Sequence, residues 1–191
     1  MVGSFASAKM VASSFWRLVC CAAVCSLVSS GTAATGRGVL ARISSLSDGK
    51  NVDFAVLPNF EFYVPTSEPP SAFLPAGPFQ SELVSEVRVA RRDDYRFTIE
   101  TSGNVRLFVN EKLLVESESK EVTSKAIQLN RGYNAIRLSL KSPKTGDTFI
   151  RLRWESQGIT KGPLPERFLK YATGDSTFAA SQLRVQGRAL F

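Results

Sequence analysis

The chain has 191 residues with 24 basic and 17 acidic side chains, a formal net charge of +7, three cysteines and no histidine. The absence of histidine excludes Ser-His-Asp catalysis, a Cys-His dyad and histidine-bound zinc within this chain. The basic excess is mild and spread along the chain rather than gathered with aromatic residues, so we expect no nucleic acid partner.

The N-terminal residues have the order of a secretory signal peptide. Lys9 and Arg17 precede an apolar run of about 11 residues, shorter than the roughly 20 that a membrane-spanning helix needs, and small residues follow. We predict a signal peptide over residues 1–34 with cleavage after Ala33 or Ala34, and an uncleaved signal anchor as the alternative. The mature protein would be secreted or periplasmic, without a stable membrane span.

All the cysteines lie inside this segment, at Cys20, Cys21 and Cys25. Cleavage would leave about 155 residues, enough for one well-buried domain. The mature chain would then hold no disulfide, no thiol nucleophile and no cysteine metal site. Lipid attachment at one of the cysteines is an alternative, although the residues before each fit the small-residue lipobox poorly.

The first predicted pair of strands is a hairpin. Residues 38–46 and 52–56 alternate between apolar and polar side chains, as strands with one buried face do. An Asp-Gly pair at residues 48–49 is a strong turn signal between them. Residues 60–64 either continue the second strand or form an edge strand.

A proline-rich connection follows the hairpin. Residues 65–78 contain five prolines, which remove backbone donors and fix φ, so we expect an irregular loop there. Phe73, Leu74 and Phe79 are predicted to pack from this connection onto the domain.

The middle of the chain alternates most regularly. Further strands are expected over residues 80–91, 95–100, 105–110, 112–116, 123–129, 133–140 and 149–155. They recur at roughly 8–12-residue spacing, which is typical of all-β sandwiches. A two-residue turn is expected at Asn110-Glu111, and the alternation turns Trp154 inward. We therefore predict an all-β fold, an antiparallel β-sandwich, over residues 38–171.

The pattern changes after Trp154. Residues 158–165 are predicted to be a loop and residues 165–171 a short turn of helix. Residues 172–191 are predicted to be a linker followed by the start of an amphipathic helix.

Several landmarks resemble the protective-antigen-fourteen domain family. They are Gly77-Pro78-Phe79, Tyr95-Arg96-Phe97, residues 103–110, residues 129–132 and Leu152-Arg153-Trp154. The resemblance implies a β-sandwich in agreement with the periodicity. It also implies a secreted, non-catalytic module that binds carbohydrate or cell-envelope ligands.

In lectin-type members of that family, two adjacent loop aspartates hold calcium, which bridges to sugar hydroxyls. The matching positions here are Thr101 and Ser102, which lack the carboxylates that calcium prefers. We therefore expect no metal and no cofactor in this chain. Thr101, Ser102 and Asn104 are the candidates for ligand binding through hydrogen bonds, and ordinary turn residues are the alternative.

Charged residues give two further hypotheses. The outward-facing Arg106, Arg137, Arg151 and Arg153 could form a basic stripe on one sheet face, suited to anionic glycans. The alternative is surface arginines paired with Glu100 and its neighbours. The acidic residues of segment 116–121 lie without apolar walls that would shift a pKa, so no catalytic residue and no enzyme activity are predicted.

The C-terminal residues 186–191 resemble the opening helix of c-type cytochrome domains, in which a Cys-x-x-Cys-His haem site follows. The second functional hypothesis is thus an accessory domain, fused to or associated with a periplasmic c-type cytochrome or haem enzyme. Haem would be a cofactor only if the chain continues. A structural spacer is the third hypothesis.

Overall fold

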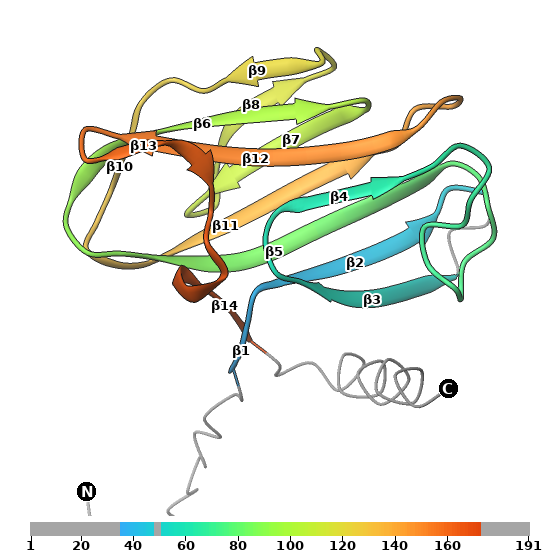
Figure 1. Ribbon diagram of the computed structural model, residues 1–191, viewed down its shortest axis with the longest axis horizontal. Coiled ribbons are helices and arrows are strands. Elements are labelled where there is room, and N and C mark those ends of the chain that lie inside the picture. The colour runs from blue at the N-terminus through green and yellow to red at the C-terminus, as the bar shows by residue number, and fades with distance from the viewer. Residues whose placement is uncertain (1–34, 48–50, 173–191) are drawn as a thin grey trace, which may run out of the picture. The chain divides into compact units, whose positions relative to one another are not determined.

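The computed structural model describes residues 35–47 and 51–172, which form two antiparallel β-sheets with a shared hydrophobic core (Figure 1). The predicted signal peptide, the Asp-Gly turn and the predicted C-terminal linker and helix from residue 173 onward lie outside the described residues. None of the helical structure found within the described ranges is long and apolar enough to cross a membrane.

The first sheet, sheet A, is organised around the long central strand β5. On one side of β5 the order continues through β11 and β7 to β8, and on the other side β2 and β14 pair with successive parts of β5. Strands β3 and β1 complete the sheet beside β2 and β14. The eight strands are β1 (Thr35–Arg37), β2 (Val39–Ser45), β3 (Val52–Leu57), β5 (Phe79–Val89), β7 (Asn104–Val109), β8 (Lys112–Ser117), β11 (Gly132–Lys141) and β14 (Leu169–Ala172).

The second sheet, sheet B, is built on the neighbouring strands β6 and β12. Strands β9 and β10 pair with successive parts of β6, and β4 and β13 do the same along β12. The six strands are β4 (Glu61–Val64), β6 (Asp93–Thr101), β9 (Glu121–Thr123), β10 (Ile127–Leu129), β12 (Thr148–Ser156) and β13 (Ile159–Pro163). Because β6 lies in sheet B and β7 in sheet A, the loop between them joins the two sheets.

The core lies between the sheets and follows the period of two. Along β5 every second residue from Phe79 to Val89 is buried, which leaves the intervening side chains on the outer face. Trp154 is 3% exposed and stacks on Tyr95 at 5.4 Å between ring centroids, so its predicted inward position is confirmed. The largest fully buried side chains are Phe60, Phe97, Leu83, Ile99, Leu107, Leu129, Ile136, Leu138, Leu140, Ile150 and Leu152.

The predicted β-sandwich is confirmed, as are its two hairpin predictions. β2 and β3 pair antiparallel, and the turn between β7 and β8 falls at Asn110 and Glu111, whose φ values are 48° and 66°. Two successive residues with positive φ are what a tight two-residue hairpin turn requires. Within residues 60–64, Glu61–Val64 form the edge strand β4, which belongs to sheet B, whereas β3 belongs to sheet A.

Three local predictions were wrong. Residues 123–129 are not one strand, because Ser124 is buried between β9 and β10 and bonds both backbone groups of Phe97. The predicted loop at 158–165 contains strand β13. The helical turn predicted within residues 165–171 is present as a 3₁₀ turn, Glu166–Phe168, although strand β14 follows it. Phe73 does not pack down, being 46% exposed, whereas Leu74 and Phe79 are buried as expected.

Candidate functional site

Thr101 and Ser102 hold the loop between the two sheets. Thr101 is 1% exposed, and its hydroxyl donates to the Phe149 carbonyl at 3.2 Å and accepts from the Gly103 amide at 3.1 Å. The Ser102 hydroxyl accepts a hydrogen bond from the Phe149 amide at 3.0 Å. Both hydroxyls are therefore engaged with backbone, and their predicted contact with a ligand stays a prediction.

Asn104, the third residue predicted to bind a ligand, lies on a strand rather than in the loop that holds Thr101 and Ser102. It begins β7 on the outer face of sheet A, where its amide group donates to the Glu118 carboxylate at 2.8 Å. The preceding Gly103 lies so close to β11 that an added Cβ would fall 2.2 Å from the Lys141 carbonyl oxygen. This close approach fixes Asn104 beside Lys141, its partner in the β7–β11 register.

Asn104 lines an open hollow of about 410 Å³ on the outer face of sheet A. This volume lies within the range of small-molecule binding sites. We call this hollow the polar groove. The groove is lined by residues of four neighbouring strands, namely Arg42 and Ser44 on β2, Gln80, Ser81 and Glu82 on β5, Ser139, Leu140 and Lys141 on β11, and Asn104 and Arg106 on β7.

The strand register explains why these side chains meet. One row across the sheet runs from Arg42 through Glu82 and Ser139 to Arg106, because these residues are successive antiparallel partners. A second row beside it joins Ser44, Gln80, Lys141 and Asn104 in the same way. Neighbouring strands are about 4.8 Å apart, so each row spans roughly 15 Å.

The charge of the polar groove is positive. Its lining has three cations, Arg42, Arg106 and Lys141, against one carboxylate, Glu82. Arg106 pairs with Glu116 at 2.7 Å, whereas Arg42 and Lys141 form no ion pair with any residue that the structure describes. Among the residues that line the groove, the sequence predicts a functional role only for Asn104 and Arg106. The alternation in residues 38–46 and 80–91 indicates which side chains point outward, but it does not indicate which strands lie next to one another.

The predicted basic stripe does not form, because its arginines belong to different sheets. Arg106 and Arg137 lie on sheet A, and Arg151 and Arg153 lie on β12 of sheet B. The alternative, paired surface charges, is what the structure shows.

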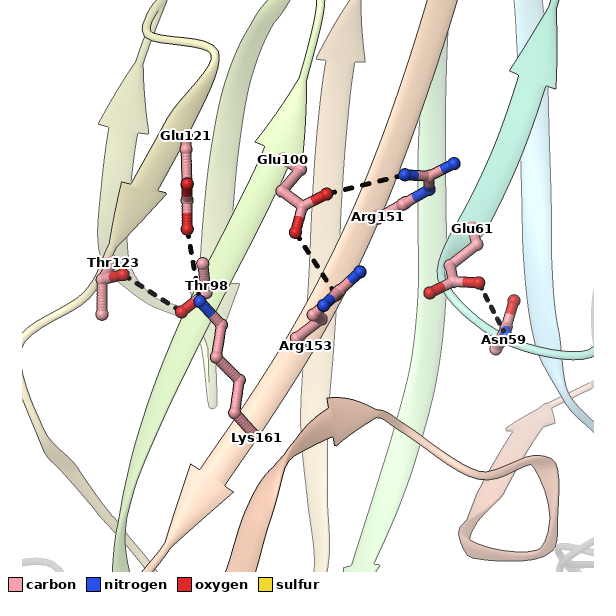
Figure 2. Close-up of polar contacts among 9 residues, drawn as sticks. All are labelled: Asn59, Glu61, Thr98, Glu100, Glu121, Thr123, Arg151, Arg153 and Lys161. Carbon is pink, nitrogen blue, oxygen red and sulfur yellow. Dashed lines mark hydrogen bonds and ion pairs between the residues drawn. The ribbon is translucent and has the colours of Figure 1, made fainter.

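On the outer face of sheet B, the arginines of β12 meet the carboxylate of Glu100 (Figure 2). Arg151 lies 3.7 Å from Glu100, and Arg153 Nε lies 3.3 Å from the same carboxylate in an ion pair without hydrogen-bond geometry. Lys161 of β13 reaches Glu121 of β9 at 3.2 Å. These three cations are therefore all engaged in ion pairs, each of which is worth little when exposed.

Asp147 ties the two long loops at one end of the sandwich together. Its carboxylate accepts hydrogen bonds from the Thr66 amide at 2.8 Å, the Thr66 hydroxyl at 2.6 Å and the Tyr63 hydroxyl at 2.5 Å. These bonds, the Thr66 hydroxyl first, lower the pKa of Asp147 from 3.8 to about 2, and the bond to Asp147 raises the pKa of Tyr63. A second hollow, of about 400 Å³, lies between these loops.

The hydrogen bonds of Asp147 to Tyr63 and Thr66, which we call the latch, predict a pH-dependent contribution to stability. Because the folded pKa of Asp147 lies below its ordinary value, the contribution is present above about pH 4 and is lost as the pH falls through about 2. We expect Asp147→Asn to lower the Tm at pH 7, and the difference from the wild type to shrink between pH 4 and pH 2. Thermal unfolding of the wild type and the variant at pH 7 and at pH 2 measures this difference in Tm. An equal difference at pH 7 and pH 2 would contradict the latch.

The described residues show no arrangement typical of a metal centre. Within residues 35–47 and 51–172, no group of three His, Cys, Asp or Glu side chains gathers as a metal site would require. Two acidic side chains of segment 116–121 are engaged on the surface, Glu116 with Arg106 and Glu118 with Asn104.

No protein-family model and no curated protein matches this chain. Several solved structures, however, have a similar fold. An anti-sigma factor domain-containing protein from Clostridium clariflavum has a TM-score of 0.63 at 20% identity, over 70% of this chain and 47% of that one. This chain thus matches about half the length of that protein.

Two further structures are complete PA14 domains. The PA14 domain of the MpAFP antifreeze protein superposes with a TM-score of 0.62 at 12% identity, covering 75% of this chain and 95% of that domain. The PA14 sugar-binding domain of an RTX adhesin has a TM-score of 0.55 at 13% identity, covering 69% and 96%. The chain therefore has the PA14-type β-sandwich fold.

Proposed function

We propose that this protein is a secreted, non-catalytic module that binds carbohydrate, and that the polar groove is its binding site. The observation that carries the proposal is the groove itself. It gathers an asparagine, a glutamine, three serines, a glutamate and three cations on adjacent strands of one sheet. Amides and hydroxyls donate as well as accept hydrogen bonds, which matches the dual character of sugar hydroxyls.

The placement of the groove supports the same proposal. Its side chains stand on four hydrogen-bonded strands, and groups on strands are held more firmly than groups on loops. A rigid surface loses little conformational entropy when it binds a ligand. The sugar-binding PA14 domain of the RTX adhesin has the same fold, which makes carbohydrate the first class of ligand to test.

Calcium has no part in the proposed binding. The hydroxyls of Thr101 and Ser102 are already bonded to Phe149, and neither residue supplies the negative charge that attracts calcium. The groove offers its polar groups without a bridging metal.

Binding to soluble polysaccharides, measured by affinity electrophoresis with calcium and with a chelator, tests the proposal. We expect retarded migration with at least one polysaccharide and the same retardation in both conditions. Migration unchanged by every polysaccharide would refute carbohydrate binding, and retardation that the chelator abolishes would refute the calcium-independent mechanism.

A further inference from the structure

We infer that the ligand of the polar groove is an anionic saccharide, whose carboxylate or sulfate groups are met by Arg42 and Lys141. This inference rests on the proposed carbohydrate function and names the class of sugar. It depends on two observations, the excess of positive charge in the groove and the finding that two of its cations form no ion pair with the residues that the structure describes.

Arg42 and Lys141 stand on either side of β5. Arg42 lies on β2, directly opposite Glu82, and Lys141 lies on β11, directly opposite Gln80. Their backbones are two strand spacings apart across the sheet, about 10 Å, and offset by two residues along it, about 7 Å, with the polar side chains of β5 between them. Both side chains are exposed, and neither forms an ion pair within the described parts of the chain.

The neighbouring charges leave these two cations available. The carboxylate of Glu82, which faces Arg42, is 3.4 Å from Arg137 on the far side of β5. Arg137 also lies over the Phe108 ring at 4.1 Å. Arg106 is held by Glu116. Glu116 and Glu82 thus pair with Arg106 and Arg137, and the carboxylate of Glu118 accepts from the Asn104 side-chain amide, so none of the three forms an ion pair with Arg42 or Lys141.

The chemistry of the two cations fits an acid group on a sugar. A guanidinium binds a carboxylate or a sulfate through two parallel hydrogen bonds, and a lysine ammonium acts as a point charge with three donors. Between them Gln80 offers an amide, and Asn104 and Ser139 lie at the next positions across the sheet. The acid groups would supply the affinity, and these polar side chains would contact the hydroxyls of the ring.

Sheet B provides the natural comparison within the same molecule. On its outer face Arg151 and Arg153 pair with Glu100, and Lys161 pairs with Glu121 (Figure 2). Arg96 on the same face forms no ion pair within the described residues, but it lines a hollow together with the carboxylates of Asp93, Asp94 and Glu155. An anion binding at Arg151, Arg153 or Lys161 would have to displace an existing partner. Arg42 and Lys141 form no ion pair within the described residues, so they can receive an anion without breaking one.

The test measures binding of the full chain to three polymers by isothermal titration calorimetry at 50 mM salt. Polygalacturonate presents carboxylates, dextran sulfate presents sulfates, and dextran presents neither. The variants are Arg42→Gln and Lys141→Gln, singly and together, and Arg42→Lys with Lys141→Arg, which keeps the charge. Arg151→Gln is the matched control, because it removes one exposed positive charge from sheet B.

We expect at least one anionic polymer to bind, with dextran at least tenfold weaker. The double glutamine variant should lose at least tenfold in affinity, whereas the charge-retaining variant and Arg151→Gln should stay within about threefold of the wild type. Comparison of the two anionic polymers tells carboxylate from sulfate as the preferred group.

Three results would overturn the inference. Equal affinity for dextran and for the anionic polymers would refute the anionic ligand while leaving carbohydrate binding intact. An equal loss in Arg151→Gln and in the single groove variants would show that the charge of the whole protein, rather than the groove, attracts the polymer. Binding to no saccharide at all would refute the proposed function and the inference together.

Discussion

Replacing Phe97 with alanine is expected to lower the free energy of unfolding by about 3–5 kcal/mol, since truncation of a buried aromatic ring leaves a cavity that the surroundings fill only in part. Phe97 is fully buried on β6, and Trp154 is its direct partner on β12. Its backbone amide and carbonyl bond to Ser124 and do not depend on the ring. The loss therefore reports packing between the sheets alone.

Denaturant unfolding of the wild type and the variant measures this change. Phe73→Ala is the matched control, because the same ring is removed from a side chain that is 46% exposed. We expect the control to change the free energy by less than about 1 kcal/mol. Similar losses in both variants would contradict the position of the core.

Replacing Gly103 with alanine is expected to cost about 3 kcal/mol, because the new methyl group would overlap the backbone of the neighbouring strand. The added Cβ would lie 2.2 Å from the Lys141 carbonyl oxygen and 3.0 Å from Leu140 Cδ1. Lys141 is paired with both Gln80 and Asn104, so its carbonyl can move only if the sheet opens at that end.

Gly162→Ala provides the control for this prediction. Its added Cβ would come no closer than 3.6 Å to another atom, the Thr160 carbonyl oxygen, which is an ordinary contact. We expect this variant to stay within about 0.5 kcal/mol of the wild type in the same unfolding experiment. A Gly103→Ala protein as stable as Gly162→Ala would show that the loop between the sheets does not approach β11 so closely.

The period-two alternation predicted most of the fold. It identifies the longer strands and their buried faces, as on β5 and β12, because a strand with one buried face must alternate. The elements that it missed are short. Strand β13 offers few residues in which a period could be seen, and its pairing with β12 depends on the chain folding back after Ser156.

The candidate site could be predicted only in part. Alternation places Arg106, Arg137, Arg151 and Arg153 on outer faces, but it does not say which sheet each strand joins. That choice depends on pairings between distant segments, such as β2 with β5 and β5 with β11. Arg42 could not be predicted as a site residue for the same reason, because it becomes a neighbour of Glu82 only through the β2–β5 register.

The bonding of the loop residues could not be predicted for a related reason. Thr101 and Ser102 are polar residues between two strands, and such positions often carry function. Here their hydroxyls bond to Phe149, which lies 47 residues from Ser102 along the chain. Local sequence cannot reveal a partner at that distance, so the residues resemble free loop positions until the sheets are assembled.

The most direct test of the account is a titration of the ¹⁵N-labelled protein with oligogalacturonate, followed by amide chemical shifts. We predict that the perturbed amides cluster on β2, β5, β7 and β11 around Arg42, Gln80 and Lys141. Perturbations confined to residues 65–78 and 142–148, around the second hollow, or to the outer face of sheet B would contradict the assignment of the binding site to the polar groove.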